Sequence, residues 1–467
     1  MDESPELWRA LIIHHREQAN FKSRTCKIYN IQSACPAEPD KLCPCGRMVR
    51  RHSFTGESLE SKEFKQGNTE RKSPNEFIEM SHTVQVPINV FGILRPAGCK
   101  FLRIDYRLPM EDLFQSILED CGGQKPALIL SIYGGVKYFT MIGQLEKEFI
   151  RGVIDAATLT NAWILTAGIN NGVSKLVGEG ISHYRLLQEY PNKVKCIGMT
   201  MWGTINENTR LEFKNASNGF PKPLCERHIP DNVQEYKETI ERNHTHCILF
   251  DSGRLNGYLN DSPRHQFVIE ACKHKDNDHS CYAVTIIVEG GLGTLEVVEN
   301  DIEEKRPIVL IQGSGRLADV LAMLVEQTSN YDRNQHRTPS DQEIEQALGL
   351  FFHSASYSDA STVKGQIKKI LQKEHRYLLH IFSMNRDKNV AETIFKAIFT
   401  VTKERKKSEL PGQEEQFRKD EDKLVDLALE WNYFDGILPI LQARQEEIIK
   451  MQRETIATGH GSEKVRP

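Results

Sequence analysis

Hydrophobic and polar positions along residues 85–335 alternate between two kinds of segment. Short apolar runs rich in β-branched residues are each followed by glycine and then by a helical spacing of apolar positions. Continuous apolar runs of this length suit strands that are buried on both faces. Their alternation with helices predicts an α/β domain with a doubly wound and mostly parallel sheet. The pattern is carried by residues 127–135, 162–181, 195–204, 246–253, 283–300 and 307–327.

The pattern changes on either side of this α/β domain at 85–335. Residues 1–84 are polar and contain several cysteines, which predicts an N-terminal cap and loop. Residues 336–455 have apolar positions three and four apart, which predicts a helical region. We expect a disordered tail over 456–467.

Composition narrows the class of protein. The chain has 467 residues, a formal net charge of −4 and a charged content of 27%, so we expect neither nucleic acid nor an anionic membrane surface as a partner. No stretch approaches the ~18 apolar residues of a membrane span, and the N-terminus lacks a secretory signal. These features predict a soluble, intracellular segment with no membrane contact of its own, in which the 11 cysteines are reduced.

Glycine-rich turns after the predicted strands are the strongest chemical signal. They lie at 134–135, 168–172, 290–293 and 313–315. Ligands of open α/β sheets bind at the carboxyl ends of the strands, where glycine lets the backbone approach a phosphate and the next helix offers free N–H groups. Arg316, at a predicted helix start, can pair two phosphate oxygens. The turns predict a phosphate-bearing ligand, and the absence of a GxxxxGK[ST] loop argues against an ATPase.

Five strings then identify a resemblance. They occur in one order over about residues 20–440 and are similar to the N-terminal melastatin homology regions of melastatin-type transient receptor potential (TRPM) cation channels. The strings are AWILTAGINNGV (162–173), NHTHCILFDSG (243–253), EGGLGTLEVVEN (289–300), QGSGRLADVLA (312–322) and LVDLALEWNYFDG (424–436).

This resemblance implies a SLOG-type, Rossmann-like domain followed by an ankyrin-like helical region. It also implies a homotetrameric, calcium-conducting channel in the plasma membrane, whose pore lies beyond these residues. The segment would face the cytoplasm and contact the rest of the channel and neighbouring subunits. The similarity is greatest to the ADP-ribose-gated branch of the family, so the implied function is a regulatory domain that binds ADP-ribose or a related nucleotide to promote gating.

In that branch, the resemblance implies a cleft that uses one tyrosine and two arginines. Tyr258 and Arg316 match directly, and Arg264 matches if one residue is missing after Tyr258; otherwise His265 takes its place. A tyrosine can stack on adenine, and two arginines can clamp a pyrophosphate. Two positions depart from the family, since Tyr133 replaces a small hydroxyl residue and Ser174 replaces a methionine. The complete predicted ligand set is Tyr133, Gly134, Gly168, Asn171, Gly172, Val173, Ser174, Tyr258, Arg264, Gly291, Gly293, Thr294, Ser314, Gly315 and Arg316.

Two other functions remain open. The GGLGT string is similar to the PGGxGTxxE motif of phosphoribohydrolases, which cleave a nucleotide N-glycosidic bond with an acidic residue. Val297 occupies that position here, and Glu296 stands one residue early, which turns a helical side chain by about 100°. We therefore favour a binding module with no catalytic residue and no required cofactor over a nucleotide N-glycosidase. The second alternative is a structural domain that assembles subunits and binds no ligand.

Two groups of residues are candidate metal ligands. Cys26, Cys43, Cys45 and His52 could bind zinc tetrahedrally, although the Cys-x-Cys spacing is tighter than usual and free thiols are the alternative. The paired histidines of NHTH could share one face and a metal, but we expect them to form local hydrogen bonds instead.

Overall fold

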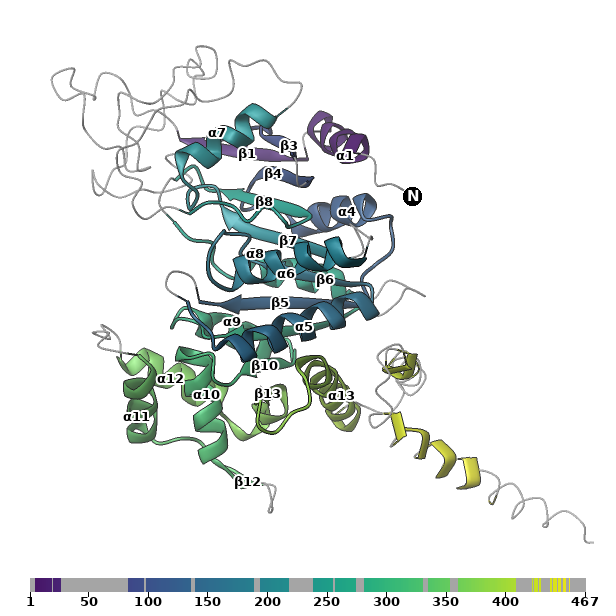
Figure 1. The fold of residues 1–467 in the computed structure, drawn as a ribbon, viewed down its shortest axis with the longest axis vertical. Helices are drawn as coiled ribbons and strands as arrows, with labels where there is room; N and C mark the ends of the chain where they lie inside the picture. The colour runs from purple at the N-terminus through teal and green to yellow at the C-terminus, as the bar shows by residue number, and fades with distance from the viewer. Residues whose placement is uncertain are drawn as a thin grey trace, which may run out of the picture.

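A central sheet of nine strands with helices on both faces forms the body of the protein in the computed structural model (Figure 1). The structure describes residues 5–18, 20–26, 83–95, 98–135, 139–188, 194–217, 238–254, 257–273, 281–330, 335–352, 360–408 and short runs or single positions between 422 and 453. Of the predicted zinc ligands, Cys43, Cys45 and His52 lie outside these residues, and only the backbone of Cys26 is described. The zinc site therefore stays a prediction.

The strands follow the order β13-β10-β9-β5-β6-β7-β8-β4-β3 across the sheet. Every neighbouring pair is parallel except β3 and β4 at one edge. The predicted mostly parallel α/β sheet is thus confirmed. Its strands are β3 (Phe91–Leu94), β4 (Cys99–Asp105), β5 (Leu128–Gly134), β6 (Ala162–Thr166), β7 (Lys195–Met201), β8 (His246–Asp251), β9 (Tyr282–Val288), β10 (Ile308–Ile311) and β13 (Leu379–Phe382).

The direction of strand addition reverses between β5 and β9. Strands β6, β7 and β8 follow β5 on one side, whereas β9, β10 and β13 are added on the other side. In doubly wound sheets this switch point opens a crevice beyond the carboxyl ends of the two central strands. The loops that leave β5 and β9 are two of the predicted glycine turns.

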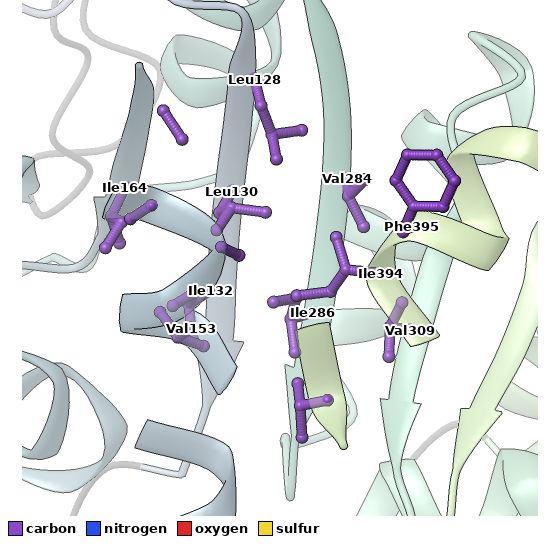
Figure 2. Packing of buried hydrophobic residues seen from close by; sticks show 14 of the residues in the cluster. Leu128, Leu130, Ile132, Val153, Ile164, Val284, Ile286, Val309, Ile394 and Phe395 are labelled. Atoms are coloured by element: carbon purple, nitrogen blue, oxygen red, sulfur yellow. The ribbon is translucent and has the colours of Figure 1, made fainter. Parts of the chain in front are cut away.

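Both faces of β5 are buried, as its continuous apolar sequence predicts. Leu128, Leu130 and Ile132 pack in a cluster with α5, α6 and α13, whereas Ile129 packs on the opposite face with α4 and α8. Figure 2 shows the first cluster, in which Ile394 approaches the β5 and β9 side chains. The helices are α1 (Pro5–Glu17), α4 (Met110–Asp120), α5 (Gly143–Leu159), α6 (Gly172–Gln188), α7 (Glu207–Ala216), α8 (Ser262–Cys272), α9 (Thr294–Glu303), α10 (Arg316–Gln327), α11 (Asp341–Phe351), α12 (Ala360–Ile370), the 3-10 helix η4 (Lys373–Leu378) and α13 (Val390–Ser408).

The sheet continues beyond residue 335, where the sequence pattern places a domain boundary. Strand β13 pairs in parallel with β10, from Ile308 against Leu379 to Ile311 against Phe382, and α13 packs against α5 and β9. The α/β unit therefore includes residues up to α13, and the predicted boundary at 335 is corrected. The four-residue strand was missed because it lies within a stretch of helical spacing. The ankyrin-like character of the later helices stays a prediction.

Among the described residues, four short strands lie outside the main sheet. β1 (Lys22–Cys26) pairs antiparallel with β2 (Thr83–Pro87), and β11 (Ser329–Asn330) pairs with β12 (Gln335–His336). Within the described part of the chain, no helix is both long and apolar enough to cross a membrane.

Candidate ligand cleft

A cavity of about 200 Å³ lies at the carboxyl ends of β5, β6 and β7. Its walls are largely apolar, and residues 258–260 and the start of α8 close one side. The structure brings together seven of the predicted ligand residues here, namely Tyr133, Gly134, Asn171, Val173, Ser174, Tyr258 and Arg264. Tyr258 is 70% exposed, so its ring is available to stack on a planar group.

Two further predicted residues act through the backbone. Gly168 has a φ of +66°, and a Cβ there would lie 2.7 Å from the Cα of Gly198. The close approach of these two glycines lets the loop after β6 turn directly into α6. Gly172, the first residue of α6, also has a positive φ of 51°. Neither residue is among those lining the cavity.

Arg264 is only 3% exposed and is held by carboxylates of its own chain. Its Nη2 donates to Asp261 at 2.6 Å and its Nη1 donates to Asp301 at 3.1 Å. These contacts hold the pKa of Arg264 well above its ordinary value despite burial, which opposes the charge. At the cavity wall, Arg264 is thus the centre of a buried ion-pair network, and its contact with a ligand stays a prediction.

Tyr133 completes this network. Its hydroxyl donates to Asp261 Oδ1 at 2.5 Å. Its ring lies under the Arg264 guanidinium, and the ring centroid is 5.0 Å from the guanidinium carbon. Burial raises the pKa of Tyr133 well above its ordinary value, so the phenol stays neutral. His265, the alternative match, instead faces Glu304 and Arg306 and is not among the cavity residues.

The turn at 313–315 is not an open phosphate cradle. The Asp319 carboxylate accepts hydrogen bonds from the N–H groups of Gly313 at 2.6 Å and Gly315 at 2.9 Å. Ser314 Oγ accepts from the Glu289 N–H and donates to the carbonyl of Ile311. In this structure Ser314 and Gly315 thus tie the loops together, and their ligand contacts stay a prediction. Sequence reasoning missed Asp319 because an acidic residue in a first helical turn is ordinary.

The turn at 290–293 is open. Within the described residues, the N–H groups of Gly290, Gly291, Leu292 and Gly293 donate to no acceptor. They lie just before Thr294, which begins α9. Successive free N–H groups at a helix start form a concave anion site that the helix dipole reinforces. Arg316 is exposed and its guanidinium lies beside this turn. A Cβ on Gly291 would be 3.9 Å from Arg316 Nη2.

Glu289 joins this turn to the cavity. Gly135 lines the cavity, and the Glu289 carboxylate lies directly against it. A Cβ on Gly135 would fall 1.7 Å from Glu289 Oε2. Glu289 and Arg316 both have left-handed backbones, with φ values of 60° and 44°, a strained conformation that is often found at functional sites. Burial raises the pKa of the Glu289 carboxyl, although the nearby Arg316 lowers it.

A line of polar groups runs beneath the cavity. The buried carboxylate of Glu241 contacts His244 Nδ1 at 2.6 Å, and His244 Nε2 contacts Thr166 Oγ1 at 2.7 Å. Thr166 Oγ1 in turn lies 2.9 Å from Ser174 Oγ. We refer to these four residues as the hydroxyl relay. Glu241 can reach the ring because Gly178 has no Cβ: a Cβ there would lie 2.0 Å from Glu241 Oε2. No local sequence pattern predicts this contact.

His246 faces away from this relay. Its Nε2 lies 2.9 Å from Asp120 Oδ2, so the two histidines make separate local contacts, as expected. Asp120, Cys121 and His246 place one ligand atom each within 4.8 Å of one another. The Lys100 ammonium already contacts the same Asp120 oxygen at 2.5 Å, and a metal ion would have to displace it.

Comparison with known proteins decides the family of this chain. Residues 99–370, more than half of the chain, match the family model described as SLOG in TRPM. The chain belongs to this family. The chain as a whole is 27% identical over 443 residues to transient receptor potential cation channel subfamily M member 2 of Mus musculus, covering 89% of this chain and 27% of that protein.

Other members of the channel family show the same relationship. Member 6 of Homo sapiens is 28% identical over 295 residues, which cover 60% of this chain and 14% of that channel. Member-like 2 of Nematostella vectensis is 26% identical over 431 residues, covering 89% of this chain and 26% of its own length. The chain thus corresponds to an N-terminal melastatin region and spans about a quarter or less of these relatives.

Proposed function

We propose that this SLOG domain is a ligand sensor that binds ADP-ribose or a related adenine nucleotide and passes the binding to a cation channel. The single observation that carries the proposal is the continuity of two features. A largely apolar cavity with an exposed tyrosine meets an open turn of free N–H groups at the switch point, and Glu289 and Gly135 form the junction.

Each part suits one end of such a ligand. The cavity suits a base, which Tyr258 can cover by stacking. The turn at 290–293 suits a phosphate, and Arg316 is the exposed cation beside it. Arg264 is already paired with Asp261 and Asp301. We therefore assign the ion pair with the phosphate of the ligand to Arg316 alone. The channel would be a homotetramer whose SLOG domains face the cytoplasm.

Calorimetry with purified protein tests this function. We expect ADP-ribose to release or absorb heat with the wild type, and Arg316→Ala to weaken binding by about 10-fold or more, because a charge-assisted hydrogen bond contributes roughly 1.5–3 kcal/mol. Arg151→Ala, on the exposed face of α5, is the matched control and should bind normally. No heat at millimolar ADP-ribose would refute the sensor.

Subunit assembly is the second candidate. Several large apolar side chains near the C-terminal end are exposed, namely Leu429, Leu438, Leu441, Ile448 and Ile449, and exposed apolar groups often mark protein contacts. A stable tetramer of the isolated chain that binds no nucleotide would favour this function. The N-glycosidase alternative has weaker support, because Glu296 is exposed while Val297 is buried.

A further inference from the structure

The cavity floor presents two polar groups from the first turn of α6. Asn171 directly precedes the helix and Ser174 follows three residues later, a spacing that places both on one helical face. Both line the cavity. The remaining polar atoms of these two side chains determine which ligand edge the floor can accept.

Asn171 presents an acceptor. Its Nδ2 donates to a carboxylate oxygen of Glu238, which fixes the orientation of the amide because a carboxylate can only accept. Its Oδ1 is buried and has no hydrogen-bond partner within the described residues. A buried oxygen without a partner is costly unless a ligand or water donates to it.

Ser174 presents a donor when His244 carries both ring protons. His244 Nδ1–H then donates to Glu241, and Nε2–H donates to Thr166 Oγ1. Thr166 Oγ1 also accepts from the Gly168 N–H at 2.9 Å, so both of its lone pairs are occupied and its own proton must go to Ser174. The proton of Ser174 is then available to a group in the cavity that this residue lines.

The surroundings of His244 favour this charged state. Glu241 is 3% exposed, and a buried carboxylate requires a counter-charge, which the ring supplies at 2.6 Å. Cys196 also faces the ring, and Arg185 lies near Glu241. With both lone pairs of its oxygen occupied, Thr166 is unsuited to act as a nucleophile, so the relay orients hydroxyl groups rather than activating one.

We propose that Ser174 and Asn171 read the edge of an adenine base, with Ser174 donating to a ring nitrogen and Asn171 Oδ1 accepting from the amino group. This inference rests on the proposed binding of an adenine nucleotide. Adenine offers an acceptor nitrogen beside an amino donor, whereas a 6-oxo purine offers a carbonyl in place of that donor. The carbonyl would face Asn171 Oδ1, and two acceptors would be left in contact.

Calorimetry with two probes tests the reading of the base. The probes are ADP-ribose and its analogue in which hypoxanthine replaces adenine. We expect the wild type to prefer ADP-ribose by about tenfold or more, and Asn171→Ala to reduce this ratio towards one. Ser174→Ala should weaken ADP-ribose binding by about fivefold or more, whereas Ser182→Ala, removing a half-buried hydroxyl from the same helix, should not.

Nitrogen-15 NMR of the imidazole rings tests the relay without any ligand. We expect both nitrogens of His244, assigned by the signal missing from His244→Gln, to be protonated at pH 7.5. A neutral ring would overturn the inference, and so would ADP-ribose binding with an unchanged base preference or an unaffected Ser174→Ala variant. Absence of ADP-ribose binding would instead refute the proposed function, and the base reading with it.

Discussion

The guanidinium of Arg264 lies over the ring of Tyr133, with its central carbon 5.0 Å from the ring centroid. Two buried carboxylates, Asp261 and Asp301, hold it there. Arg264→Ala should therefore lower the free energy of unfolding by about 3–5 kcal/mol, because it leaves the Asp261 carboxylate buried without a counter-charge. Asp301 keeps its ion pair with Arg306. Urea unfolding measures this loss. Wild-type stability combined with weaker ADP-ribose binding would instead indicate a ligand contact.

Two glycines of the candidate site should respond differently to alanine. A Cβ on Gly134 would lie 2.3 Å from the Val288 carbonyl oxygen, whereas a Cβ on Gly293 would meet nothing within 4 Å. Gly134→Ala must push β5 and β9 apart at the switch point, and should cost about 1–3 kcal/mol or more. Gly293→Ala should leave the thermal midpoint close to that of the wild type. Equal midpoints would contradict the close approach.

The sequence was sufficient to predict the central strands and the glycine turns. Continuous apolar runs such as that of β5 require burial on both faces, and this constraint acts locally on the chain. Strand β13 escaped prediction because its four residues, Leu379–Phe382, carry no pattern of their own. Pairing with β10 determines its conformation.

The ligand cleft was only partly predictable, because partners distant in sequence decide what each group does. Asp301 lies 37 residues from Arg264 and holds this arginine in a buried ion pair. Asp319 occupies the N–H groups of one glycine turn, whereas the similar turn at 290–293 stays open. Both turns have closely spaced glycines before a helix, so the local sequence cannot show which turn keeps its N–H groups available for a ligand.

Removing Asp319 should open the second glycine turn. Asp319→Ala leaves the N–H groups of Gly313 and Gly315 without their acceptor, which should cost about 1–3 kcal/mol of stability. It also removes a negative charge near Arg316, so binding of inorganic phosphate should become tighter. Urea unfolding and phosphate titration monitored by NMR check the two effects. Asp341→Ala, at the exposed start of α11, is the control, and equal phosphate affinity in both variants would contradict the expectation.

The hydroxyl relay should make the stability depend on pH above neutrality. Burial lowers the pKa of His244, but Cys196 and Glu241 together raise it from 6.5 to about 10. The folded protein then retains a proton that the unfolded chain releases above pH 6.5, so the stabilisation is complete below 6.5 and is lost as pH rises towards 10. The slope is at most about 1.4 kcal/mol per pH unit for one proton.

Urea unfolding of the wild type and of His244→Gln, at intervals between pH 6.5 and 10, isolates this contribution from those of other groups. The difference between the two free energies of unfolding should shrink steadily across the interval, because the variant has no ring proton to lose. Glu241→Gln should reduce the same slope, since it removes the carboxylate that favours the charged ring. Parallel curves for the wild type and His244→Gln would mean that His244 is neutral in the folded protein, and that Ser174 accepts rather than donates at the cavity floor.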